Sequence, residues 1–468
     1  MGIKFSRNQK IEIAIVALAI ILRVGYFWIN MATHDNSLLG TIWKSESYYE
    51  IAHNILSGHG FSGATTEPYT PDSWRTPLYP LFIAANFKLF GSDLAVIISQ
   101  IIMGSILALL AKRISYHIMN NEKIAIGVGI FFAIEPLLIR LTSVLLTETL
   151  FLTLFFGFLL AFYNYLKNEK FSYLAVSAVL LGLTTLTRPI TQYLPVIIVA
   201  LIIWIFRKKI TIRVFWRMLG FLVIFVMMLS PWLYRNSRLF GSPALAATSA
   251  NNLYGYFIPS ILALKNNISY NEAKNKFFAE EKISDLTIID LKTANHFTQR
   301  SIEILKKMPP YDTTKVIVLT VVSLFTQDGY RDILGDLGLD ANLPAIPVFK
   351  IIQSPRIALS IIGGLIRGPA IIVIAGRIFW ILMTLFAALG IIKYLKRERL
   401  QNKISFTFLI IFYFTITSAV VGLGVTARYR APINIFIATF AFYAIGRQEN
   451  TKLSSLKPIK VESPGLMK

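Results

Sequence analysis

The sequence predicts an all-α polytopic membrane protein with ten to twelve transmembrane helices, interfacial helices in the first outer loop and a small helical outer domain. The 468 residues are 55% hydrophobic, and their mean hydropathy is +0.59. Apolar runs close to the ~20 residues that a helix needs to cross a bilayer recur along the chain. Basic residues gather in alternate loops between these runs, as they do in the cytoplasmic loops of membrane proteins.

Each long apolar run is interpreted as a transmembrane helix. The predicted spans are residues 11–31, 93–111, 124–141, 144–166, 172–187, 190–206, 214–232, 371–392, 404–424 and 431–446. Two shorter runs, 315–326 and 357–369, fit either interfacial or re-entrant segments or a further pair of spans. We expect the first run to be retained, because it is too long for a signal peptide and no small-residue cleavage site follows it.

The net charge of +22 is explained by topology better than by nucleic-acid binding. Lys and Arg cluster before the first span, in every second loop and in the C-terminal tail. This pattern places both termini in the cytoplasm of a multi-pass cell-membrane protein, and it places the loops 32–92 and 233–355 outside. No nucleic-acid partner is expected. The absence of cysteine excludes disulfides and thiolate metal sites.

The chain divides into four parts on this topology. These are an N-terminal transmembrane catalytic module (1–232) that carries the first outer loop, an outer helical loop domain (233–355), C-terminal transmembrane helices (356–447) and a cytoplasmic basic tail (448–468). Within the outer domain, Ser269 and Glu272 have capping-box spacing and predict a helix that runs to about 282. A second, amphipathic helix is predicted from 286 to 307, before two prolines.

Several arginines lie at the outer ends of the predicted spans, where the positive-inside rule disfavours them. They are Arg75, Arg140, Arg188, Arg235, Arg238, Arg428 and Arg430. Any one of them can snorkel to lipid headgroups. As a set they favour a shared anionic ligand, such as a lipid phosphate, because guanidinium groups bind phosphate bidentately.

Carboxylates complement these arginines. Asp35, Glu46, Glu50 and Asp72 lie in the first outer loop, and Glu148 begins the fourth span. Glu135 precedes a proline within the third span, and we expect it to have a structural role there, paired with Arg140 on a kinked helix.

The first outer loop begins with an amphipathic helix at 46–57, because apolar residues repeat there at helical spacing. Gly58 stands at its predicted C′ position. Such a helix lies in the plane of the membrane interface, and its acidic start then points toward the spans.

Five stretches, in this order, resemble the polyprenyl-phosphate-sugar glycosyltransferases of the C-type membrane fold, a group that includes protein O-mannosyltransferases and bacterial aminoarabinose transferases of lipid A. They are YYEIAHNILSGHGFS with RTPLYPLFIA, EPLLIRLTSVLLTETLF, LGLTTLTRPI, PWLYRNSRLFG with NNLYGYF, and ARYRAPI. The resemblance spans residues 46–432 and implies a polyprenyl-phosphate sugar donor, with a glycolipid, a glycan or a protein as acceptor.

The resemblance also implies roles for individual residues. The catalytic base is a carboxylate early in the first outer loop, for which Glu46, then Asp35, then Glu50 are the candidates. The family usually has an aspartate there, and Lys44 falls close to where the acid is often found. Arg75 matches the cation that contacts the donor phosphate, and Glu148 matches an acidic residue at the head of the fourth span. Later arginines at outer helix ends are matched by Arg188, Arg235, Arg428 and Arg430. The candidates for contacts with the acceptor or the sugar are Tyr48, Tyr49, Asn251 and Tyr254.

The residue types suit this chemistry. A carboxylate can take the proton of the acceptor hydroxyl, and arginines can stabilise the departing phosphate. One carboxylate suffices for an inverting displacement, whereas a retaining reaction would need a second one, for which Glu148 is available. We expect Glu148 to order arginines instead. The five histidines are scattered and predict no metal site, no cofactor is expected beyond the lipid carrier, and a requirement for a divalent metal stays open.

Three other functions fit parts of the pattern. A lipid-linked glycan polymerase or ligase would also need outer arginines, but its key loop would lie late in the chain. A transporter or flippase would show repeated halves and broken helices at mid-bilayer. A membrane scaffold protein would leave the charge pattern unexplained.

Overall fold

The computed structural model describes residues 6–34, 37–38, 45–207, 211–283, 289–339, 369–398 and 401–446. Within these ranges the regular elements are helices, and no strand is present. The all-α prediction is therefore confirmed for the described part of the chain. The run 357–368 and the tail from 447 lie outside it.

Seven stretches among the described residues are long and apolar enough to cross a membrane. They are α1 (Arg7–Thr33), α5 (Leu94–Met119), α8 (Glu148–Asn168), Pro189–Phe206 with α10 (Leu194–Phe206), α11 (Ile212–Phe240), α20 (Ala370–Arg397) and α21 (Asn402–Ala419). The other three predicted spans form shorter helices: α6 (Glu122–Ile134) with α7 (Pro136–Arg140), α9 (Phe171–Thr187) and α23 (Asn434–Ile445). The chain is a multi-pass membrane protein. Helix α11 continues eight residues beyond the boundary predicted at 232.

The third predicted span is broken at Glu135, and the reason is local. Pro136 disfavours helical geometry at the preceding residue, so Glu135 is extended (φ −63°, ψ 119°). Its Oε2 accepts a hydrogen bond from the backbone N–H of Leu138 (2.7 Å) and so caps α7. The predicted pairing of Glu135 with Arg140 is wrong, because Arg140 instead binds Asp336 of α17 (Tyr330–Asp336).

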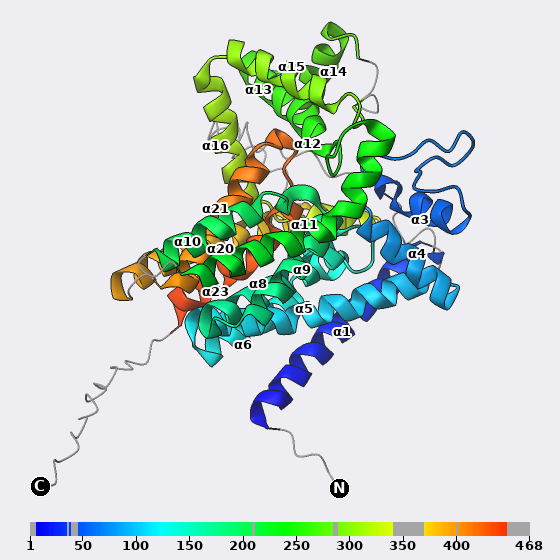
Figure 1. The fold of residues 1–468 in the computed structure, drawn as a ribbon. Coiled ribbons are helices and arrows are strands. Elements are labelled where there is room, and N and C mark those ends of the chain that lie inside the picture. The colour runs from blue at the N-terminus through cyan, green and yellow to red at the C-terminus, as the bar shows by residue number, and fades with distance from the viewer. Residues whose placement is uncertain are drawn as a thin grey trace, which may run out of the picture.

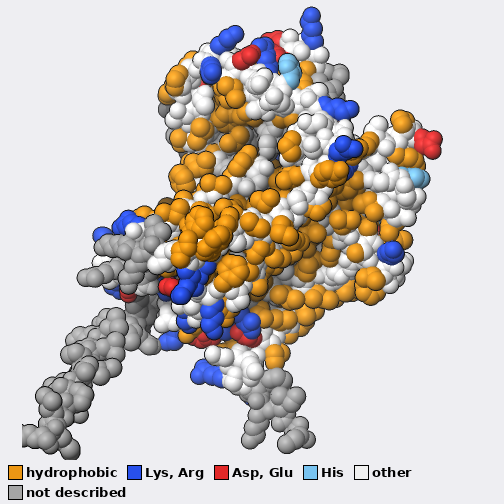
Figure 2. All heavy atoms as spheres, viewed as in Figure 1, with side chains coloured by type: hydrophobic (Ala, Val, Ile, Leu, Met, Phe, Trp, Pro, Cys, Tyr) orange, Lys and Arg blue, Asp and Glu red, His pale blue; other side chains and the backbone are white. Residues whose placement is uncertain are grey.

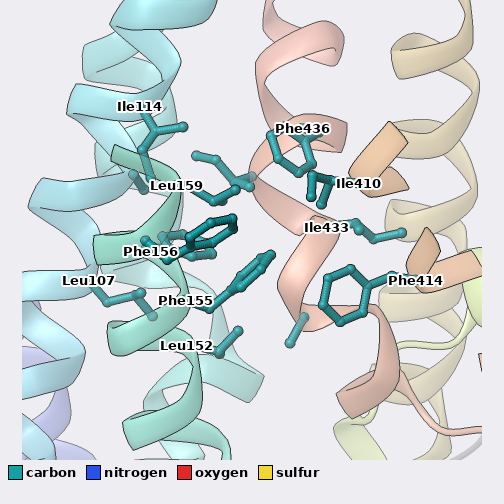
Figure 3. Close-up of a cluster of buried hydrophobic side chains, with 14 of the residues drawn as sticks. Leu107, Ile114, Leu152, Phe155, Phe156, Leu159, Ile410, Phe414, Ile433 and Phe436 are labelled. Carbon is teal, nitrogen blue, oxygen red and sulfur yellow. The ribbon is translucent and has the colours of Figure 1, made fainter. Parts of the chain in front are cut away.

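The main core lies between α5, α8, α21 and α23 and is rich in phenylalanine (Figure 3). Phe155 of α8 meets Phe414 of α21 edge-on, with ring centroids 5.1 Å apart. Gly390 of α20 lets that helix approach α23 so closely that a Cβ there would overlap the carbonyl oxygen of Phe440. This packing joins the N-terminal and C-terminal helices into one bundle.

A helical head covers one end of the bundle, opposite the end where α1 begins and α23 ends (Figure 1). We define the head as α12 (Thr248–Asn251), α13 (Ile258–Asn266), α14 (Tyr270–Glu280), α15 (Ala294–Lys307) and α16 (Pro310–Thr326). Ser269 caps α14 as predicted. The helix predicted from 286 to 307 corresponds to α15, which begins at Ala294 because the Asp290 carboxylate accepts backbone N–H groups of Lys292 and Thr293 and forms a turn first. Residues 284–288, where the predicted start falls, lie outside the described residues.

The loop between α1 and α5, for which we keep the name first outer loop from the predicted topology, forms the expected helix, α3 (Tyr48–Leu56), followed by α4 (Leu78–Phe90). Ile51 and Ala52 of α3 are fully buried, and Gly58 is left-handed (φ 81°), as its predicted C′ position requires. Figure 2 shows apolar side chains over the visible face of the bundle, with Lys and Arg both near the end where α1 begins and over the head.

Candidate active site

Glu148 is the centre of a charged cluster at the head-side end of the bundle. It is the first residue of α8, where the helix dipole stabilises a carboxylate, and it is only 2% exposed. Its Oε1 accepts from Nη1 of Arg188 (2.7 Å) and from Nη1 of Arg428 (3.3 Å). Two guanidinium groups therefore share one carboxylate oxygen.

The two arginines reach Glu148 from distant parts of the chain. Arg188 follows α9 and precedes Pro189, so its backbone is extended (φ −145°, ψ 124°) and leaves the helix axis. Arg428 lies on the short helix α22 (Ala427–Arg430). The carboxylates of Glu148 and Glu46 hold the pKa of Arg428 above its ordinary value, against the opposing effect of burial. Both side chains keep partial exposure, 22% and 23%, so a ligand can reach them.

Glu46 brings the first outer loop to the same cluster. Its Oε1 lies 3.7 Å from Nη1 of Arg428, and its backbone carbonyl accepts from Nε of Arg75 (2.7 Å). The Glu46 side chain is 42% exposed, in contrast to the buried Glu148. Glu46 and Ser47 both have left-handed backbones (φ 69° and 57°), which costs free energy for residues other than glycine and is typical of functional sites.

Asp72 holds Arg75 in place. Its Oδ1 accepts the backbone N–H groups of Trp74 and Arg75, and its Oδ2 accepts from Nη1 of Arg75 (2.9 Å). The carbonyl of Asp72 accepts from Nη1 of Arg235 (3.0 Å), whose guanidinium also lies 4.4 Å from the ring centroid of Trp232. Asp72 therefore contacts both arginines, and it connects Arg235 to Arg75 and the rest of the cluster.

The segment 72–76 connects the cluster to its surroundings. The Ser73 carbonyl accepts from the Ala247 backbone N–H, and the Ser73 Oγ accepts from the Leu291 backbone N–H in the head. Thr76 Oγ1 donates to the carbonyl of Thr187 beside Arg188 (2.8 Å). Trp74 packs against the apolar core of the head. This short segment of the first outer loop therefore contacts the head through Ser73, the beginning of the same loop through Arg75 and the end of α9 through Thr76.

Tyr48 lies under the cluster. Its ring is buried edge-on against Tyr79, with centroids 5.2 Å apart. Burial raises the pKa of its hydroxyl well above the ordinary value, and the charges of Glu46, Arg188 and Glu148 also act on it. The hydroxyl is therefore a neutral hydrogen-bonding group at physiological pH.

The structure does not bring the remaining predicted site residues into this cluster. Tyr49 donates to Asp93 (3.1 Å), on the other side of α3. Tyr254 donates to Glu281 within the head (3.0 Å), and Asn251 is buried on α12. Arg430 is fully buried 3.6 Å from the ring centroid of Trp380 and donates to the carbonyl of Leu324.

The other two base candidates stay predictions. Glu50 is half-buried on α3 and makes none of the cluster's contacts described above. Asp35 lies outside the described residues.

Sequence reasoning missed two members of the site. Asp72 was recognised only as a loop acid, although its i,i+3 spacing to Arg75 is a signal for pairing. Tyr429 follows Arg428, and its ring centroid lies 5.9 Å from the guanidinium carbon of Arg188. Among the described residues, no group of three or more His, Asp or Glu side chains is placed to hold a metal ion.

Comparison with known families identifies one part of the chain, which carries three residues of this cluster. Residues 74–234 match the sequence model of the dolichyl-phosphate-mannose-protein mannosyltransferase family. The resemblance inferred from the sequence is confirmed for this segment. It is about a third of the chain and contains Arg75, Glu148 and Arg188. No curated protein sequence matches the chain.

Solved structures of membrane glycosyltransferases are similar to the chain at low sequence identity. Two structures of the Archaeoglobus fulgidus oligosaccharyltransferase match 93% of the chain at 12% identity, with TM-scores of 0.48 (AglB with an inhibitory peptide and a dolichol-phosphate) and 0.49 (apo form). The chain spans 50% of the length of each. ArnT from Cupriavidus metallidurans, bound to undecaprenyl phosphate, matches 92% of the chain and 77% of its own length at 12% identity, with a TM-score of 0.41.

Proposed function

We propose that the chain is a membrane glycosyltransferase that moves a sugar from a polyprenyl-phosphate donor to an acceptor hydroxyl at the outer face of the membrane. This proposal depends on five charged residues that lie together at one end of the bundle: Glu46, Arg75, Glu148, Arg188 and Arg428. The family match over residues 74–234 supports it. Helix α1 begins at the opposite end of the bundle, and the charge pattern of the sequence predicts that this end is cytoplasmic, which supports an outward-facing site.

The arginines have hydrogen-bonding capacity left for a phosphate. Within the described part of the chain, Arg188 and Arg428 contact carboxylates through Nη1. Each guanidinium carries five N–H donors, so Nε and Nη2 of both remain for phosphate oxygens. Phosphate oxygens gain charge as the glycosidic bond breaks. Donors fixed at that position therefore stabilise the transition state more than the ground state.

The two carboxylates have different roles in this proposal. The exposed Glu46 is the general base that takes the proton of the acceptor hydroxyl, a contribution of about 10²–10⁴-fold in rate. The acceptor oxygen then attacks the anomeric carbon as the bond from that carbon to the phosphate oxygen breaks. The buried Glu148 orients Arg188 and Arg428, so we expect a single inverting displacement and no glycosyl-enzyme intermediate.

The test is transfer of a labelled sugar by the purified protein in liposomes. The donor is a synthetic polyprenyl-phosphate sugar, and extracted membrane glycolipids and proteins serve as mixed acceptors. We expect wild type to turn over and Glu46→Gln to lose at least 100-fold in rate, because the amide cannot accept the proton. Glu67→Gln, an exposed glutamate in the same loop, serves as the matched control and should keep wild-type activity.

Two outcomes would change the assignment. Full activity of Glu46→Gln would move the base to Asp35 or Glu50. Movement of intact donor lipid between leaflets, without sugar transfer by wild type, would overturn the transferase and indicate a flippase.

Arg75 provides a separate test of donor binding. Arg75→Ala should raise the KM for the donor at least tenfold, since a hydrogen bond to a charged group contributes about 1.5–3 kcal/mol. Arg238→Ala, at the exposed end of α11, is the matched control. Normal donor kinetics in Arg75→Ala would remove Arg75 from the donor site.

A further inference from the structure

The chain reaches Arg428 through a short linker, residues 422–426, which follows α21 and leads directly into α22. The backbone N–H of Leu423 in this linker donates to Oγ of Ser260 on α13 in the head (2.9 Å). Ser260 is fully buried, and its hydroxyl donates in turn to the carbonyl of Tyr256, one helical turn earlier (2.6 Å). The hydroxyl therefore acts as donor and as acceptor, and it ties the linker to the head.

A glycine permits this close contact. Gly422 is buried and has a left-handed backbone (φ 63°), which a residue with a side chain rarely adopts. A Cβ at this position would also overlap Oγ of Ser260. The start of the linker can therefore lie against Ser260 only because residue 422 has no side chain.

A second residue holds the linker closer to Arg428. Gln327 follows the last residue of α16, and its Nε2 donates to the carbonyl of Val425 (2.9 Å) and to Oγ of Ser323 (2.8 Å). At the other end of α22, Arg430 donates to a carbonyl of α16 (2.9 Å). The head and the residue that follows it therefore hold α22 on both sides of Arg428.

The position of α22 matters because the contacts of the Arg428 side chain are long. Its Nη1 lies 3.3 Å from Oε1 of Glu148 and 3.7 Å from Oε1 of Glu46. Both distances exceed the ~2.7–3.2 Å that is usual for N–H···O hydrogen bonds. Arg188, in contrast, lies 2.7 Å from the same oxygen of Glu148. The backbone that carries Arg428 must therefore fix its guanidinium group more than its carboxylate partners do.

We propose that Ser260 and Gln327 are positioning residues, which hold the linker so that Arg428 meets the donor phosphate. The inference rests on the proposed function. Both residues act through the backbone of the linker, and a displacement of about 1 Å in a group that stabilises the transition state can cost on the order of 100-fold in rate. The head thereby contributes to donor use through its contact with residues 422–426.

Ser301 provides a matched control for Ser260. Both serines are fully buried in the head, and Oγ of Ser301 also donates to the carbonyl four residues earlier, that of Phe297 (2.7 Å). Within the described part of the chain, only Ser260 of the two also accepts a hydrogen bond from the linker. Ser260→Ala and Ser301→Ala therefore lose the same intrahelical hydrogen bond, but only the first also loses the link to Arg428.

The test compares donor kcat/KM in liposomes with thermal unfolding in detergent. We expect both serine variants to lower the unfolding temperature, since each loses a buried hydrogen bond. Donor kcat/KM should fall about tenfold for Ser260→Ala and stay within twofold for Ser301→Ala. Gln327→Met has a side chain of similar size without the donor, so it should behave like Ser260→Ala. Gln299→Met, on an exposed position of α15, is its control.

A double variant tests whether Ser260 acts through Arg428. In an Arg428→Lys background, Ser260→Ala should lower donor kcat/KM by less than a further twofold, because a lysine ammonium has no planar fork to orient. Two residues that act through one contact give such non-additive effects.

Three results would overturn the proposal. Equal losses of donor kcat/KM in Ser260→Ala and Ser301→Ala would show that only the stability of the head matters. An undiminished loss in the Arg428→Lys background would show that Ser260 does not act through Arg428. Unchanged kinetics in Ser260→Ala and Gln327→Met would remove the head from donor use. In each case wild-type turnover still stands, whereas absence of wild-type turnover refutes the proposed function itself.

Discussion

Two arginine–carboxylate groups in this protein are built from the same residue types but use them differently. At Arg140, Nε and Nη2 both bind the Asp336 carboxylate (2.7 and 3.0 Å), and the Tyr26 hydroxyl donates to the same group (2.8 Å). At Glu148, Arg188 and Arg428 compete for one oxygen through one nitrogen each. In the group at Arg140 the hydrogen-bonding atoms are largely paired within the protein. In the group at Glu148 each arginine uses only one nitrogen for the carboxylate.

This difference explains how one kind of ion pair can serve two purposes. The bidentate geometry at Arg140 fixes α7 against α17 and leaves little capacity for a ligand. The cluster at Glu148 holds two cations close together beside an apolar pocket, and an anion that enters relieves their repulsion. We therefore expect changes at Arg140 and Asp336 to affect stability and changes at Glu148 and Arg428 to affect activity.

The largest expected effect is that of Glu148→Gln on transfer. Arg188 and Arg428 lose the carboxylate that orients them, so we expect the rate to fall about 10²–10³-fold, as when a charge-stabilising donor is removed from an active site. Asp336→Asn is the matched change in the other group and should keep the rate within threefold. Sugar transfer in liposomes measures both. Equal losses in the two variants would erase the distinction between the groups.

Lysine substitutions should separate the groups further. Arg428→Lys keeps the charge but loses the planar fork, so we expect about a tenfold to 100-fold rise in the donor KM, with a small change in thermal unfolding. Arg140→Lys cannot bind Asp336 bidentately, so its unfolding temperature should fall while the donor KM is kept. Thermal unfolding in detergent and donor kinetics would be recorded side by side. A destabilised Arg428→Lys with normal kinetics would reverse the two roles.

Protection by ligand sharpens the same comparison. A ligand that binds only the folded protein stabilises it by about 2.7 kcal/mol at a concentration of 100 times Kd. Bare polyprenyl phosphate should therefore raise the unfolding temperature of wild type and of Arg140→Lys, and it should do so much less for Arg428→Lys. An equal rise in all three would place the phosphate away from Arg428.

The smallest effect is expected at a third pair, Glu281 with Arg300 in the head. This pair is also bidentate (2.7 and 3.0 Å), but Arg300 is 39% exposed. Hydrogen bonding by Arg300 holds the pKa of Glu281 below its ordinary value, 4.5. The stabilisation is therefore fully present above that value and is lost as pH falls through the lower, folded-state pKa. Glu281→Gln should flatten the acid limb of the unfolding-temperature profile slightly, and an unchanged acid limb would show that the pair contributes nothing.

The sequence predicted features that depend on local patterns. The apolar repeat before Gly58 identified α3, and Ser269 identified the start of α14, because both signals lie within a few residues of the element that they define. The arginines of the cluster were found because a charge at the outer end of a span is unusual by itself. For these features neighbouring residues carry enough information.

Features that depend on distant contacts were missed. Arg140 was assigned to the nearby Glu135, but its partner Asp336 lies 196 residues away in the sequence. Arg430 shares the pattern of Arg428, yet the opposite face of α22 directs it toward Trp380 and the buried bundle. A cavity next to Arg428 is lined by residues of α7, α17, α20 and α22, and no sequence motif marks it.

The contacts of segment 72–76 determine whether the head can be exchanged without changing the rest of the protein. Ser73 fastens it to the head, Arg75 to the first outer loop and Thr76 to the end of α9. A chimera that exchanges the head alone would replace Leu291, whose backbone N–H donates to Ser73 Oγ, and would thereby disturb the neighbouring Arg75. An exchange of the head is therefore expected to alter the position of Arg75 as well, unless residues 72–76 travel with the head.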